Sequence, residues 1–161
     1  MKVERPLYFE DFEEGQVYET GSHTLNEDEI TTFGKNYAPL PYHTDPEAAK
    51  ETSFGTLVAA GYQTAAVTFV LFAKTGALSL SGMGSPGVDS LRWKRPVKVG
   101  DTLSVMANVV ECSPASREGG RDAGRIRYDT LNQNDEIVMT LTSLHFVRRR
   151  PALEHRHKRG S

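Results

Sequence analysis

A histidine in the first third of the chain stands where it could take part in chemistry. His43 follows a Pro-Leu-Pro sequence at 39–41 and precedes a helix start, with Asp45 as the expected N-cap and Pro46 as the first helical residue. Because proline fixes the backbone and donates no hydrogen bond, we expect His43 to be held on a stiff loop at a helix mouth. A histidine in this setting is a candidate general acid or base. The alternative is a loop histidine that only binds backbone groups.

The neighbours of His43 in the sequence offer it no clear partner. Ala38 carries only a methyl group, which can neither hold a water molecule nor move a proton. Asp45 is two residues away, but an N-cap carboxylate has its oxygens bound to backbone N–H groups. Asn36 and Tyr37 could polarise a water molecule, although neither residue type is a good base at neutral pH.

The second stretch of interest opens a long apolar segment. Residues 57–74 contain no acidic side chain and predict a central helix, wrapped by other elements, that stops at Gly76. The first turns are rich in small residues, including Ala59, Ala60 and Gly61. Small residues allow a ligand or a neighbouring element to approach the backbone closely. On this pattern alone, tight packing of the helix on a sheet is the simpler interpretation.

The remaining elements would position these two stretches. We expect a strand at 17–25, and a helix at 27–35 that begins at a capping box of Asn26 and Glu29. A short helix is expected at 46–52. Alternating apolar residues predict four more strands, with a hairpin turn at 132–135 between the last two. These strands are expected at 88–94, 102–111, 125–132 and 137–148. The order of strand, helices and then antiparallel strands indicates an α+β fold.

The bulk composition is that of one ordinary globular domain. The chain has 161 residues, of which 38% are hydrophobic and 25% are charged, and we assign residues 1–150 to a single domain. The single cysteine, Cys112, excludes an intramolecular disulfide framework and favours a reducing, cytoplasmic setting. The start of the chain lacks the apolar core of a signal peptide. The longest apolar run is too short to span a membrane.

Charge is unevenly distributed along the chain. The formal net charge is −2, yet residues 148–161 carry six basic side chains against one glutamate. The rest of the chain is therefore acidic, which argues against a nucleic-acid partner. We expect residues 151–161 to form a basic, flexible tail. His23 and His145 lack the spacing of metal ligands, and we expect no metal site.

Four stretches together resemble the MaoC-like (R)-specific enoyl-CoA hydratase/dehydratase family. The resemblance implies a hotdog fold, in which a curved antiparallel β-sheet wraps a long central helix. It also implies reversible hydration of a trans-2-enoyl thioester without a cofactor, a place in fatty acid metabolism, and a homodimer. The stretches that carry it are 39–45 (PLPYHTD), 54–64 with FG and AGYQT, 84–93 with GSPGVD and LRW, and 95–103 with RPV and GDTL.

The resemblance implies roles for individual residues. His43 falls on the family's catalytic histidine, and Gly61 on the glycine whose backbone N–H would bind the thioester oxygen. The small residues beside Gly61 would then leave room for the thioester carbonyl. The family's catalytic aspartate lies five residues before the histidine, where this chain has Ala38. The positions implied to bind substrate are Ala38, Pro41, Tyr42, Ala60, Tyr62, Gly84, Ser85 and Pro86.

Three functions follow from these observations. The first is a hydratase or dehydratase of acyl-CoA thioesters that is impaired by Ala38. The second is a non-catalytic protein that binds acyl thioesters. The third is a hotdog thioesterase, which needs a carboxylate or an activated water near the thioester, and the absence of acids in residues 57–74 counts against it. Arg92, Lys94 and Arg95 could meet the phosphates of CoA or form a solvated charged edge.

Overall fold

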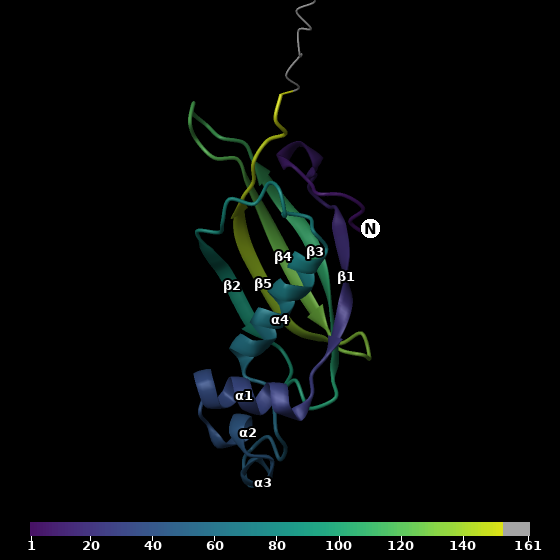
Figure 1. Ribbon diagram of the computed structural model, residues 1–161, viewed down its shortest axis with the longest axis vertical. Coiled ribbons are helices and arrows are strands. Elements are labelled where there is room, and N and C mark those ends of the chain that lie inside the picture. The colour runs from purple at the N-terminus through teal and green to yellow at the C-terminus, as the bar shows by residue number, and fades with distance from the viewer. Residues whose placement is uncertain (153–161) are drawn as a thin grey trace, which may run out of the picture.

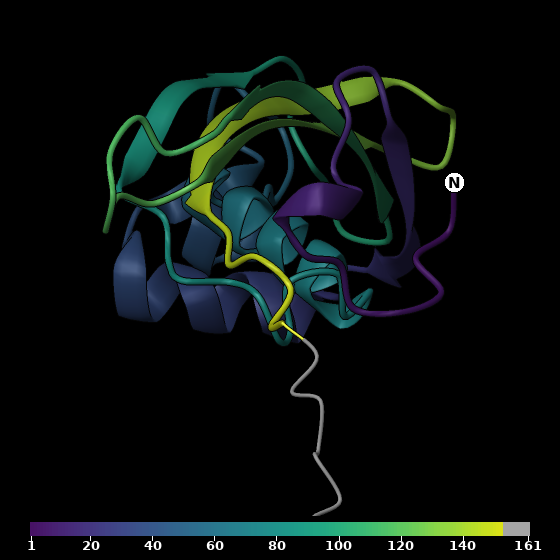
Figure 2. The same ribbon diagram turned by 90° about the horizontal axis from the view of Figure 1, so that it is seen from above.

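A five-stranded antiparallel sheet curves around one long helix in the computed structural model, which describes residues 1–152 (Figures 1 and 2). The strands lie in the order β1-β3-β4-β5-β2, so β1 and β2 form the two edges. Their bounds are β1 Val17–Thr24, β2 Gly87–Trp93, β3 Thr102–Ser113, β4 Ala123–Leu131 and β5 Ile137–Phe146. The predicted α+β architecture with a long central helix is confirmed.

Four α-helices precede β2, and three of them gather at the N-terminal end of the central helix (Figure 1). Asn26 and Glu29 form the predicted capping box, in which each side chain accepts a hydrogen bond from the other's backbone N–H. A short 3₁₀ helix, Phe9–Asp11, lies near the start of the chain. The α-helices are α1 Glu27–Tyr37, α2 Pro41–Thr44, α3 Pro46–Ala49 and α4 Gly61–Lys74.

The core lies between the concave face of the sheet and α4. Alternate residues of β3 are buried, as the period of a half-buried strand requires. Tyr128 of β4 is fully buried, and its ring meets the rings of Phe69 and Phe72 edge to face. The hydroxyl groups of Thr68 in α4 and Thr130 in β4 lie 2.7 Å apart, which ties the helix to the sheet by a buried hydrogen bond.

The start of the central helix differs from the prediction. The α4 helix begins at Gly61, and residues 57–60 are extended because their backbone groups bond to other segments. The N–H of Val58 donates to the carbonyl of Tyr42 (2.9 Å), and the N–H of Ala59 donates to the carbonyl of Val97 (2.8 Å). An apolar run without a helix breaker gives no sign of these partners. The predicted short helix at 46–52 also ends earlier, at Ala49.

Part of the central helix stays exposed in the structure of residues 1–152. The sheet curves over one side of α4 (Figure 2), and the side chains of Tyr62 and Val70 on this helix are 69% and 49% exposed. The edge strand β2 is likewise largely exposed. Residues 1–152 thus leave parts of α4 and of β2 uncovered.

No helix within residues 1–152 combines the length and the apolar character needed to cross a membrane. The predicted basic tail at 151–161 falls, from residue 153 onwards, outside the described part of the chain.

Candidate active site

His43 lies in the single turn of α2 rather than on the predicted loop. Pro41 occupies the first position of this turn, and the backbone N–H of His43 donates to the carbonyl of Leu40 (2.9 Å). The imidazole is buried. His43 therefore stands in a short helical turn that begins at a proline and is followed at once by Asp45, the N-cap of α3.

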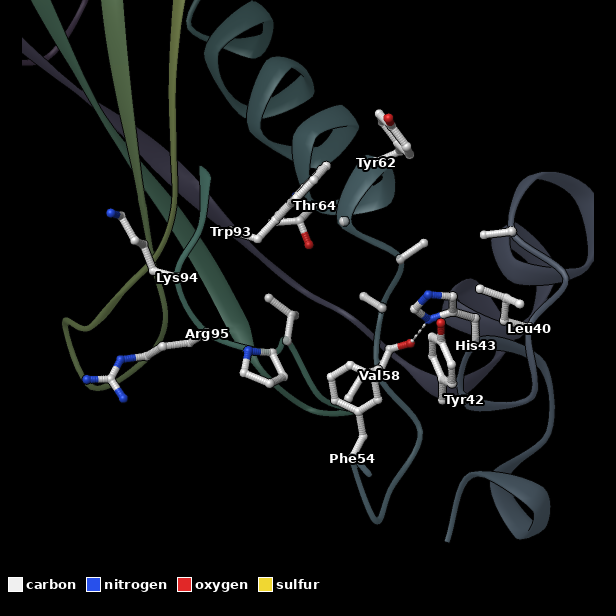
Figure 3. Close-up of a pocket in the computed structure, with 16 residues that line it drawn as sticks. Leu40, Tyr42, His43, Phe54, Val58, Tyr62, Thr64, Trp93, Lys94 and Arg95 are labelled. Atoms are coloured by element: carbon white, nitrogen blue, oxygen red, sulfur yellow. Dashed lines mark hydrogen bonds between the residues drawn. The ribbon is translucent and has the colours of Figure 1, made fainter. Parts of the chain in front are cut away.

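The extended residue Val58 fixes the imidazole from the other side. Its N–H donates to the carbonyl of Tyr42, and its carbonyl accepts a hydrogen bond of 2.7 Å from Nδ1 of His43 (Figure 3). A carbonyl oxygen only accepts, so Nδ1 must carry the proton. In the neutral ring Nε2 then holds the lone pair, which is the state a general base requires.

Close contact between α1 and α2 also positions His43. A side chain at Gly34 would overlap the backbone carbonyl of His43. Glycine at this position therefore lets α1 lie directly against the turn that carries the imidazole.

A cavity of about 490 Å³ opens beside the imidazole, which is a size typical of small-molecule sites. Its walls come from the residue after α1, from α2, from the segment before α4, from the start of α4, and from the end of β2 with the residues that follow it (Figure 3). Six positions named from the sequence line this cavity: Ala38, Tyr42, His43, Ala60, Gly61 and Tyr62. Most of the remaining walls are apolar, formed by Leu40, Phe54, Val58, Ala59, Trp93, Pro96 and Val97.

Gly61 begins α4, at the wall of this cavity. The N–H groups of Gln63 and Thr64 bond to the carbonyl of Ala60, whereas the N–H of Gly61 has no partner within residues 1–152. Free N–H groups at a helix start carry partial positive charge and suit a developing oxyanion. The start of α4 can therefore act as a donor to a ligand oxygen.

The space beside Gly61 is not left open as we expected from the sequence. A methyl group at this position would overlap the indole ring of Trp93, whose Nε1 would lie 2.6 Å from it. Trp93 also meets the ring of Tyr62 edge to face, with centroids 5.5 Å apart. Glycine thus leaves the room that the half-exposed ring of Trp93 occupies.

The lining of the cavity includes no carboxylate. Asp45 is an N-cap, as predicted, and its Oδ1 accepts from the N–H groups of Glu47 (2.9 Å) and Ala48 (3.2 Å). Ala38, at the position where the resemblance implies an aspartate, contributes a methyl group to the same wall. Across residues 1–152, no cluster of three His, Cys, Asp or Glu side chains is arranged to hold a metal ion.

Basic residues lie at one end of the cavity. Lys94 and Arg95 line it, but Arg92 does not. In Figure 3 the charged ends of Lys94 and Arg95 point away from His43. The guanidinium of Arg95 lies 3.6 Å from a carboxylate oxygen of Glu136.

Four predicted site residues do not line the cavity. Pro41 is the first residue of α2, two positions before His43, and does not itself line the cavity. Gly84, Ser85 and Pro86 lie before β2, at the opposite end of this strand from Trp93. The hydroxyl of Ser85 lies 3.0 Å from that of Ser143 in β5. A role of these four residues in substrate binding stays a prediction.

Sequence reasoning missed Trp93 and Thr64 as cavity residues. Trp93 is part of a motif named above, but nothing in the motif places its ring on Gly61. Thr64 follows Gly61 by three residues, so both lie on one face of α4, and this spacing could have indicated it.

Comparison with solved structures identifies the fold of this chain. The crystal structure of a MaoC-like dehydratase from Rhodospirillum rubrum matches with a TM-score of 0.84 and 33% identity, covering 91% of this chain and 99% of that one. This match, together with the curved antiparallel sheet around one long helix, shows that the chain has a hotdog fold.

The sequence comparisons identify the family. The model of the MaoC like domain matches residues 11–127. An (R)-specific enoyl-CoA hydratase from Rhodospirillum rubrum is 33% identical over 113 residues, covering 68% of this chain and 74% of the relative. A 3-hydroxybutyryl-CoA dehydratase from Methylorubrum extorquens is 30% identical over 137 residues, covering 84% and 80%. The chain belongs to the MaoC-like hydratase and dehydratase family.

Proposed function

We propose that this protein binds acyl-CoA thioesters and catalyses the reversible hydration of a trans-2-enoyl thioester. One observation carries the proposal. The buried imidazole of His43, with its lone pair on Nε2, and the unpaired N–H of Gly61 belong to the walls of one apolar cavity. Two of the named relatives, a hydratase and a dehydratase of CoA thioesters, support the same chemistry.

In this proposal, each residue of the cavity has its own role in the reaction. The N–H of Gly61 binds the thioester oxygen, which gains enolate-like charge when water adds to the β-carbon. Nε2 of His43 takes the proton of the attacking water. Tyr42, Ala60 and Tyr62 surround the acyl group, and Lys94 attracts the phosphates of CoA. The reaction needs only water and proton transfer, so we expect no cofactor.

Ala38 limits the rate of this reaction. A second group beside the imidazole would orient the water molecule and supply a proton, and the loss of one such group costs about 10²–10⁴ in rate. We therefore expect a slow hydratase. A protein that only binds acyl thioesters is the alternative that the missing carboxylate favours.

The test is the hydration of crotonyl-CoA by the natural chain and by Ala38→Asp, followed by absorbance. We expect the substitution to raise turnover by about 10²–10⁴, because it supplies the missing proton-transfer group. Ala152→Asp, at an exposed alanine outside the cavity, is the matched control and should change nothing. If neither the natural chain nor Ala38→Asp turns over while both still bind CoA thioesters, the protein is a binding protein.

We also propose that the chain forms a homodimer and works in the cytoplasm. The outer edge of β2 has no strand beside it within residues 1–152, and Val88 on it is 49% exposed. The exposed face of α4, with Tyr62 and Val70, offers apolar surface to the same partner. A second copy would cover both surfaces. The free thiol of Cys112 suits a reducing compartment.

A further inference from the structure

We propose a second reaction for this cavity, in which His43 alone moves the double bond of a 3-enoyl thioester from C3 to C2. The proposal rests on the acyl-thioester binding proposed above. It adds an isomerase activity that uses one base twice and does not require a partner at position 38.

The first observation is that, among residues 1–152, His43 supplies the one imidazole in the lining of the cavity, and no carboxylate stands beside it. The other side chains there with polar groups are the phenols of Tyr42 and Tyr62, the hydroxyl of Thr64, the indole N–H of Trp93 and the cations of Lys94 and Arg95. Among the side-chain types in this lining, the imidazole is the one that commonly serves as a general base. A reaction in this cavity must therefore use one imidazole for every proton that it moves.

The second observation is that the imidazole is prepared for such a transfer. The carbonyl of Val58 fixes the proton on Nδ1, which leaves Nε2 free to accept a proton from a substrate carbon. The walls beside it are apolar, including Leu40, Phe54 and the methyl group of Ala38. An apolar wall excludes competing water and strengthens the interaction of an enolate oxygen with the N–H of Gly61.

The reaction balances with these groups alone. Nε2 of His43 takes a proton from C2, and the electron pair of that C–H bond forms a C1–C2 double bond as charge moves to the thioester oxygen. The N–H of Gly61 stabilises this dienolate. The imidazolium then returns the proton to C4, the C2–C3 double bond forms, and the carbonyl is restored. No water, cofactor or second acid is consumed.

Ala38 separates the two reactions. Hydration places a hydroxyl on C3 and a proton on C2, so it benefits from two groups that hold one water molecule. Isomerisation returns the same proton two carbons away and needs no water. The alanine at position 38 therefore impairs hydration but leaves isomerisation intact.

The experiment supplies trans-3-hexenoyl-CoA to the natural chain and follows the conjugated 2-enoyl thioester by absorbance and proton NMR. Hydration of crotonyl-CoA is measured on the same preparation. We expect isomerisation to proceed, and Ala38→Asp to raise hydration without raising isomerisation. A chain that hydrates but does not isomerise overturns this proposal and leaves the proposed function standing. A chain that binds thioesters but does neither overturns both reactions.

The variants assign the reaction to the imidazole. His43→Asn keeps an N–H where Nδ1 donates to the carbonyl of Val58, so it should fold, but it has no base. We expect it to lower isomerisation by at least about 10²-fold with an unchanged melting temperature. His23→Asn, at a half-exposed histidine paired with Glu29, is the matched control and should keep full activity. Isomerisation that survives in His43→Asn overturns the assignment.

A labelled substrate tests the single base directly. When the 3-enoyl thioester carries deuterium at C2, one base that carries the same hydrogen delivers part of this deuterium to C4 in ordinary water. We expect product with deuterium at C4, read by NMR. Product with only solvent hydrogen at C4 contradicts a single shuttling base.

Discussion

The contact between Gly61 and Trp93 decides what position 61 tolerates. Gly61→Ala would push a methyl group into the indole ring. Overpacking of a core costs about 1–3 kcal/mol, and we expect the lower end of this range because Trp93 is 47% exposed. We expect this loss in the free energy of unfolding, measured with urea. Gly21→Ala is the matched control, because a methyl group at Gly21 would meet no atom within 4 Å.

A double variant separates packing from chemistry at this position. With Trp93→Ala in the background, Gly61→Ala should cost much less, because the ring that it strikes is gone. An equal cost in both backgrounds would show that Trp93 is not the reason for glycine. Acyl-thioester binding by the double variant then reports on the N–H of Gly61, which both substitutions leave in place.

Cavity residues that lie close together in the sequence could be predicted. A cavity residue that the sheet places there from a distant part of the sequence could not. His43 with Ala38 and Tyr42, and Gly61 with its neighbours, lie in two short motifs and reach the cavity as expected. Trp93 arrives from the end of β2, and its place depends on the curvature of the sheet. No local pattern encodes that curvature.

At the scale of elements, β4, β5 and α4 enclose a histidine that the proposed chemistry does not use. His145 of β5 is buried, and its Nε2 lies 2.8 Å from the hydroxyl of Tyr128. Burial lowers the pKa of His145 to about 4, from an ordinary value of 6.5, and the same cause raises the pKa of Tyr128. The imidazole is therefore neutral where the unfolded chain would bind a proton.

This shift predicts how stability depends on pH. As pH falls below about 6.5, the unfolded chain takes up a proton at His145 and the folded chain does not, so stability falls until about pH 4. The full loss is about 3 kcal/mol, measured as the free energy of unfolding across this range. His145→Gln should show a shallower fall than the natural chain. Equal slopes for the two proteins would contradict a neutral buried imidazole.

Most elements could be predicted from the sequence because their signals are local. The capping box of α1 and the alternation in β4 and β5 required no tertiary contact. The extended residues 57–60 were missed because their partners, Tyr42 and Val97, come from other parts of the chain. The same segment also holds His43, because the carbonyl of Val58 accepts a hydrogen bond from Nδ1 of this residue. The site therefore depends on a segment whose structure the sequence did not predict.

At the scale of the whole molecule, the open edge of β2 and the outer face of α4 lie beside the cavity. Trp93 ends β2 and Tyr62 lies on the first turn of α4, and both line the cavity while being largely exposed. A second copy that covers these surfaces would also close the cavity to water. We therefore expect assembly and turnover to be coupled through the two aromatic rings.

Val88→Lys tests this coupling, because a lysine on an edge strand opposes pairing with another strand. We expect the natural chain to elute as a dimer in size-exclusion chromatography with light scattering, and the variant as a monomer with lower thioester turnover. Ser22→Lys places the same charge on β1, the opposite edge, and should change neither property. A natural chain that is monomeric at all concentrations would contradict the dimer. A monomeric Val88→Lys with full turnover would contradict the coupling, since the cavity would then be complete within one chain.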